Sequence, residues 1–103
     1  MKNVALTMRA DFFGKYNEER NSIDPRWYEF LRQFKCRIIL IPNDLFLVKS
    51  ILNFYKIDLI ILSGGGNPLK PENVGDKKRL DIEKFLLEQS ILLTIPVIGI
   101  CRG

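Results

Sequence analysis

Short aliphatic runs that lack polar alternation constrain the fold of this chain most. They occupy residues 3–9, 36–41, 57–62 and 95–101, and helix-like stretches or loops separate them. A strand that is aliphatic at successive positions is typical of a parallel sheet covered on both faces. Strands that alternate with helices favour right-handed crossovers. We therefore predict an α/β fold with a doubly wound, mostly parallel sheet and helices on both faces.

Two of the connecting segments give contrasting signals. Residues 10–22 combine Gly14, two asparagines and mixed charges without periodicity, so we predict a loop. Asp24-Pro25 then predicts a helix start, because Asp accepts amide hydrogen bonds there and Pro is tolerated at the first helical position. Four apolar residues follow at helical spacing and are expected to form a core-facing stripe rather than an aromatic binding box: Trp27, Phe30, Leu31 and Phe34.

Two further helices are predicted. Asn43 or Asp44 can cap the first, which presents Leu47, Val48, Ile51, Leu52 and Tyr55 on one face. The second covers residues 76 to about 92, and its predicted apolar side consists of Leu80, Ile82, Phe85, Leu86, Leu87, Ile91 and Leu92. It begins with Lys77-Lys78-Arg79, which opposes the helix dipole and is interpreted as a solvated first turn, with a phosphate contact as the alternative.

Composition and charge exclude several function classes. The 103 residues allow one domain or part of one, and the 16 Lys and Arg residues are interleaved with 12 acidic residues. A nucleic-acid groove would concentrate its positive charge, so we predict no nucleic-acid partner. The longest apolar stretch, residues 91–101, is shorter than the ~20 residues of a membrane span. No secretory signal is evident either, so we expect a cytoplasmic protein without a membrane partner.

The most specific pattern for chemistry is the Gly-x-Cys-x-Gly unit formed by Gly99, Cys101 and Gly103. It follows a strand, as in a sharp turn that exposes a nucleophile, and flanking glycines leave room for the strained backbone. Cys101 is therefore the candidate nucleophile. A small buried hydrophobic role is the alternative for Cys101, and it is the expected role for Cys36, which has no flanking glycines. The sequence contains no histidine, the commonest general base and metal ligand.

A second pattern, Gly64-Gly65-Gly66, follows the strand predicted at residues 57–62. Glycine lets the backbone approach a substrate closely because no Cβ intervenes. The three glycines can supply one amide donor to the oxyanion of an acyl-transfer reaction, and the amide of Arg102 can supply another. A flexible turn or a phosphate-approach loop is the alternative interpretation of the triple glycine.

The whole chain, residues 1–103, resembles the N-terminal half of a class I glutamine amidotransferase domain, of the γ-glutamyl hydrolase-like branch. The resemblance rests on three segments. Residues 97–103 are similar to the nucleophile elbow of the family, residues 58–68 to its oxyanion strand and loop, and residues 79–83 to an Arg-Asp segment that precedes the nucleophile strand. The implied architecture is a truncated flavodoxin-like sheet.

By this resemblance Cys101 attacks a γ-glutamyl amide and forms a thioester, with Gly64, Gly65, Gly66 and Arg102 around the oxyanion. The substrate is glutamine or another γ-glutamyl amine, no metal or cofactor is implied, and a synthetase is the implied partner if ammonia is transferred. The family's catalytic His and Glu have no counterpart here, so we expect the isolated chain to be inactive. The alternative hypothesis is a non-catalytic flavodoxin-like α/β module with a binding or regulatory role.

Overall fold

The central sheet has four parallel strands in the order β4-β1-β5-β6. They are β1 (Lys2–Thr7), β4 (Cys36–Ile41), β5 (Leu59–Leu62) and β6 (Val97–Gly99). The structure is a computed structural model that describes residues 1–64 and 74–100. In the register of the sheet, Val4 of β1 lies between Ile38 and Leu59.

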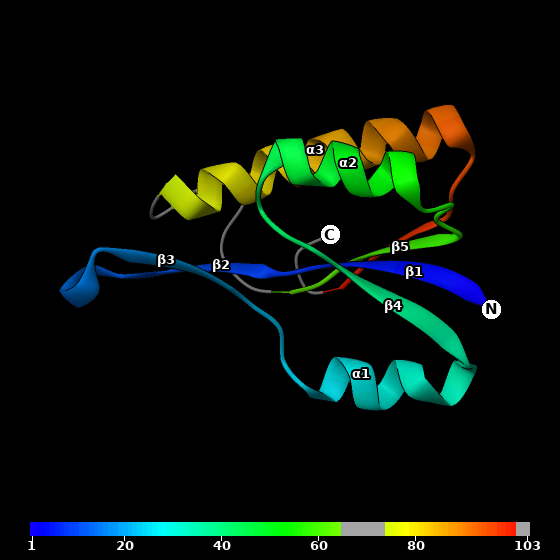
Figure 1. Cartoon of the computed structure of the whole chain (residues 1–103), viewed down its shortest axis with the longest axis horizontal. Helices are drawn as coiled ribbons and strands as arrows, with labels where there is room; N and C mark the ends of the chain where they lie inside the picture. Colours follow the sequence, from blue (N-terminus) through cyan, green and yellow to red (C-terminus); the bar gives the residue numbers. More distant parts are fainter. Residues whose placement is uncertain (65–73, 101–103) are drawn as a thin grey trace.

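Helices cover both faces of this sheet (Figure 1). α1 (Arg26–Leu31) lies on one face, and α2 (Leu45–Phe54) and α3 (Val74–Leu93) lie on the other. The chain passes from β1 to β4 on one side and then returns to β5 and β6 on the other side of β1. Right-handed crossovers in opposite directions place the helices on opposite faces. The prediction of an α/β fold with a parallel sheet covered on both faces is confirmed.

Alternate side chains of β1 supply both hydrophobic cores. Ala5 belongs to the core beneath α2 and α3, while Val4 and Leu6 belong to the core beneath α1. The first core is formed by Ala5, Ile41, Val48, Ile57, Ile60, Leu62, Ile82 and Leu86. The second is formed by Val4, Leu6, Leu31 and Ile61, and Cys36 packs against it and donates its Sγ hydrogen to Leu31 O. The packing role predicted for Cys36 is confirmed, although its side chain is half-buried rather than buried.

The loop predicted at residues 10–22 is wrong. This segment instead forms a second sheet of two antiparallel strands, β2 (Arg9–Phe13) and β3 (Glu18–Ser22). The 3-10 turn η1 (Gly14–Tyr16) joins the two strands. Most of its side chains are exposed, so the apolar alternation that marks a half-buried strand is absent. Other contacts hold this hairpin: the Arg20 guanidinium lies 4.2 Å from the Phe13 ring centre, and Lys78 of α3 pairs with Glu19 at 2.9 Å.

The core-facing stripe predicted for the first helix is only half correct. Leu31 is buried and Trp27 packs against the second core, but Phe30 and Phe34 are 52% and 62% exposed. α1 ends at Leu31 and continues as the 3-10 turn η2 (Arg32–Phe34). In so short a helix only the i, i+4 pair faces the sheet. The Phe30 and Phe34 rings instead contact each other edge to face, with centres 5.2 Å apart.

Asp44, rather than Asn43, caps α2. Its Oδ2 accepts a hydrogen bond from the Leu47 amide at 2.9 Å, as an N-cap carboxylate does. Val48 lies fully buried on the predicted face of α2, and Ile51, Leu52 and Tyr55 pack against the core. Leu47 differs from the prediction, since it is 47% exposed at the edge of that face.

The buried face of α3 also differs from the prediction. Lys77 and Lys78 are exposed as expected, but Arg79 is only 1% exposed. The residues that turn inward follow a helical period and include three polar side chains: Arg79, Ile82, Glu83, Leu86 and Ser90. Leu87, Ile91 and Leu92 lie outside this buried face of the helix and are 44%, 81% and 74% exposed. The polar residues on the buried face interrupt its hydrophobic pattern, so the sequence prediction placed the apolar side of α3 too far toward Leu87, Ile91 and Leu92. Over the described ranges 1–64 and 74–100, no helix has the length and apolarity required to cross a bilayer.

Candidate functional site

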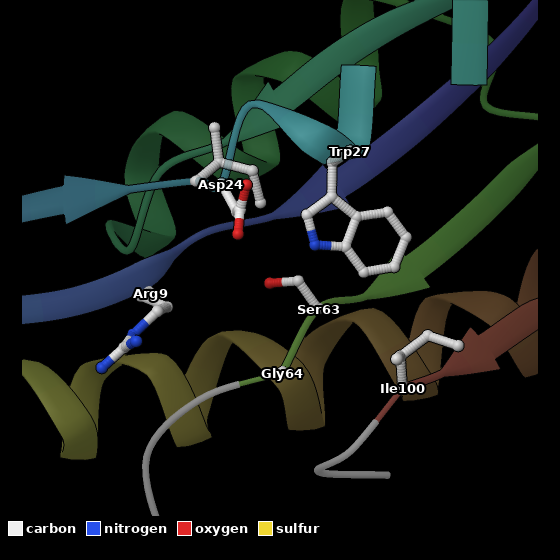
Figure 2. A pocket seen from close by; sticks show the side chains of 7 residues that line it. Arg9, Asp24, Trp27, Ser63, Gly64 and Ile100 are labelled. Carbon is white, nitrogen blue, oxygen red and sulfur yellow. The ribbon is translucent and has the colours of Figure 1, made fainter. Parts of the chain in front are cut away.

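A cavity of about 230 Å³ opens at the carboxyl ends of β1 and β5. Its walls are formed by Arg9, Ile23, Asp24, Trp27, Ser63, Gly64 and Ile100. Figure 2 shows Arg9 and Asp24 on one side, Trp27 and Ile100 on the other, and Ser63 between them. β1 is also where the direction of strand addition reverses, and ligands in open α/β sheets bind at such a switch point.

The β2–β3 hairpin brings the two charged walls together. Its ladder pairs Arg9 with Ser22, and Ile23 and Asp24 follow directly in sequence. Asn43, after β4, anchors the hairpin to the sheet. Its amide donates to Asn21 Oδ1 at 2.7 Å, and its Nδ2 donates to the Met8 carbonyl at 3.1 Å. Arg9 and Asp24, fifteen positions apart in the sequence, therefore line the same cavity.

Ser63 is fixed to β1 by two buried hydrogen bonds. Its amide donates to Thr7 Oγ1 at 2.9 Å, and its hydroxyl donates to the Thr7 carbonyl at 2.7 Å. Thr7 and Ser63 are each 1% exposed, so their polar groups cannot bond to water and bond to each other instead. These bonds continue the attachment to β1 one residue beyond the end of β5. The floor of the cavity is thus joined rigidly to the central strand.

Arg79 reaches from α3 to the start of the glycine segment. Its Nη1 donates to the Gly64 carbonyl at 3.3 Å, and its Nη2 donates to the carbonyl and hydroxyl of Ser63. Its Nε pairs with Glu83 Oε1 at 3.2 Å, one helical turn further on. The Ser63 carbonyl and the Gly64 amide belong to the same trans peptide and point to opposite sides. Because the Ser63 carbonyl faces Arg79, the Gly64 amide points away from it. Helix α3 therefore sets the orientation of the backbone where the glycine segment begins.

Asp24 is held by Arg26 at the start of α1. The Asp24 carboxylate accepts hydrogen bonds from the Arg26 amide at 2.9 Å and from its Nη2 at 2.6 Å. These bonds from Arg26, the side-chain bonds above all, lower the pKa of Asp24 from 3.8 to about 2. Asp24 thus accepts an amide hydrogen bond at the start of α1, as predicted, although Pro25 rather than Asp24 occupies the N-cap position. The charge of Asp24 is already matched by a cation.

We expect the Asp24 carboxylate to titrate near pH 2 in the folded protein. A lowered pKa stabilises the fold above the ordinary value of 3.8, and this contribution is lost as the pH falls from there through about 2. The carboxyl carbon shift of Asp24, followed by NMR during acid titration, gives the midpoint directly. In Arg26→Gln the midpoint should return toward 3.8, and an unchanged midpoint would contradict the assigned cause.

The candidate site residues fall into two groups. Gly64 lines the cavity, whereas Gly65, Gly66, Cys101 and Arg102 lie outside the described residues. Ile100, which directly precedes Cys101, lines the same cavity, and its amide donates to the Leu62 carbonyl at 3.0 Å. The chain positions that lead into both motifs are therefore adjacent in space.

Sequence reasoning did not assign a site role to four cavity residues: Arg9, Asp24, Trp27 and Ser63. Arg9 ends the first aliphatic run, and Ser63 directly follows the run at residues 57–62. This position is the signal that could have identified them, because polar residues at the ends of such runs gather at the carboxyl edge of the sheet. Asp24 and Trp27 had been interpreted only as a cap and a core residue. Nothing local in the sequence indicates that the hairpin carries Asp24 to the cavity.

Comparison of the chain with models of protein families gives no match, and comparison with curated proteins gives none either.

Proposed function

We propose that this chain carries the nucleophile and oxyanion donors of an enzyme that hydrolyses γ-glutamyl amide bonds, as a glutamine amidotransferase or a γ-glutamyl hydrolase. One observation carries the proposal. Gly64 is the first residue of the triple glycine and Ile100 directly precedes Cys101, and both line one cavity at the carboxyl edge of a parallel sheet. The sheet order is compatible with the flavodoxin-like, class I glutamine amidotransferase-like fold that we propose.

In the proposed reaction, the Cys101 thiolate attacks the γ-carbonyl carbon and a carbon–sulfur bond forms. Amides of the glycine segment and of Arg102 stabilise the oxyanion, and Arg79 fixes the backbone from which the segment starts. The carbon–nitrogen bond then breaks and the amine leaves with a proton, after which water hydrolyses the thioester to a free γ-carboxylate. A His-Glu pair, which the family resemblance implies and these 103 residues do not include, manages the protons. We therefore expect the chain alone to be inactive.

Selective alkylation of Cys101 tests the proposal. The product of the complete reading frame is treated with a diazo-ketone analogue of glutamine, and the modified peptide is identified by mass spectrometry. We expect label on Cys101, protection by excess glutamine or a γ-glutamyl amine, and no label on the half-buried Cys36. Cys101→Ser is the matched control and should remain unlabelled.

The contrary outcome is equally informative. A Cys101 that reacts no faster than Cys36, in a protein that phosphate stabilises against heat, would favour the non-catalytic α/β module. In that case the glycine segment would be a phosphate-approach loop rather than part of an oxyanion hole. Hydrolysis that persists in Cys101→Ser would also contradict the proposed nucleophile.

A further inference from the structure

The two charged residues in the cavity wall, Asp24 and Arg9, differ in how far other residues of the chain already bind them. Asp24 is bonded to Arg26 through both its carboxylate oxygens. Arg9, in contrast, approaches Asp11 only at 3.7 Å, beyond hydrogen-bond distance, and its side chain is 55% exposed. The Arg9 guanidinium therefore keeps donors available for a ligand anion.

The backbone at Arg9 is held in place, although the Arg9 side chain is exposed. Its backbone pairs with Ser22 in the hairpin ladder, and the preceding carbonyl, that of Met8, accepts a hydrogen bond from Asn43 Nδ2. A guanidinium presents parallel N–H groups that match the two oxygens of a carboxylate. Holding the backbone beneath it reduces the entropy lost when a ligand binds.

The remaining walls limit the ligand in size and character. Ile23, Trp27 and Ile100 are apolar or aromatic, and the volume of about 230 Å³ is below the range typical of sites for drug-sized molecules. A short aliphatic chain that ends in a carboxylate meets both conditions. Its methylene groups would lie against Trp27 and Ile100, with its anionic end at Arg9.

We propose that Arg9 binds a carboxylate of an amino-acid-sized ligand in this cavity. That this ligand is the substrate rests on the proposed function, whereas the binding itself does not. Within a γ-glutamyl compound the carboxylate has two sources, the α-carboxylate of the glutamyl half and a carboxylate on the amine half.

Trp27 provides the first test, because it is the only tryptophan of the chain and lines the cavity. Glutarate is titrated while Trp27 fluorescence is recorded, with 1,5-pentanediol as the uncharged probe of equal length. We expect a saturable change with glutarate only, and an affinity lowered about tenfold or more in Arg9→Gln. Arg37→Gln is the matched control, since it removes the same charge from β4 beside Asn3, away from the cavity. Equal affinities in wild type and Arg9→Gln, or no response to glutarate, would overturn the proposal.

Kinetics of the product of the complete reading frame, measured with two substrates, then separate the sources of the carboxylate. In Arg9→Gln, an equal rise in KM for γ-glutamylglycine and γ-glutamylethylamide assigns Arg9 to the glutamyl half. A rise for γ-glutamylglycine alone assigns it to the amine half. If KM is unchanged for both, Arg9 does not bind substrate. If Cys101 is inert but glutarate binding still depends on Arg9, the proposed function fails and the carboxylate site stands.

Discussion

Replacement of Arg79 by methionine is expected to lower the free energy of unfolding by about 3–5 kcal/mol. Arg79 is 1% exposed and donates to the Ser63 and Gly64 carbonyls as well as to Glu83. Methionine fills similar space but donates no hydrogen bond, so buried acceptors and the Glu83 carboxylate lose this partner. Urea denaturation followed by circular dichroism measures the loss, which appears as a lower midpoint at constant slope.

Two controls separate burial from charge in this experiment. Lys78→Met removes a neighbouring cation whose pair with Glu19 is about half exposed, and it should cost no more than about 1 kcal/mol. Arg79→Met combined with Glu83→Leu removes both charges from the interior and should recover much of the loss. A single Arg79→Met variant as stable as Lys78→Met would show that the buried network contributes little.

Leu6→Ala is expected to cost about 2–5 kcal/mol of unfolding free energy. Leu6 is 0% exposed on the central strand and packs in the core with Val4, Leu31 and Ile61. β1 is hydrogen-bonded to β4 on one side and β5 on the other, so the surrounding structure has little freedom to collapse into the space left by the removed methyl groups. The same denaturation measurement applies.

Leu92→Ala provides the matched control for Leu6→Ala. Leu92 is 74% exposed on α3, so the identical change in chemistry removes little buried surface and should alter stability by less than about 0.5 kcal/mol. Similar losses in the two variants would contradict the assignment of Leu6 to the core. They would also indicate that the face of α3 that carries Leu92 is covered in solution.

The sequence predicted the elements whose patterns arise from burial. The aliphatic runs at β4 and β5, the start of α1 and the cap of α2 were correctly identified, because strand burial and carboxylates that accept amide hydrogen bonds at helix starts leave local signatures. The hairpin was missed because its strands are mostly exposed and are held by long-range contacts such as Lys78 with Glu19. The buried face of α3 was misassigned because Arg79 and Glu83 neutralise each other inside the fold, which single-residue hydrophobicity does not represent.

Part of the candidate site could also be predicted from the sequence, whereas the part that depends on the hairpin could not. The position of Gly64 beside the chain leading to Cys101 follows from parallel strands whose carboxyl ends share one edge, and this topology can be inferred from sequence. The roles of Arg9 and Asp24 depend on the pairing of Arg9 with Ser22, and register in an exposed hairpin is weakly encoded. Arg79 had been interpreted as part of a solvated first turn and lay in a segment that resembles the family, but its bonds to Ser63 and Gly64 depend on how α3 packs against β5 and leave no local signal.

The cavity walls are drawn from four separate stretches of chain, at residue 9, residues 23–27, residues 63–64 and residue 100. Unfolding disperses these stretches, so a molecule bound among them interacts with the native state alone. Thermodynamic linkage then makes occupancy visible as heat resistance, with about 2.7 kcal/mol gained when the free ligand is at a hundredfold excess over its Kd. Melting curves recorded across a panel of small carboxylic acids can therefore rank ligands without any turnover, and Arg9→Gln serves as the blank.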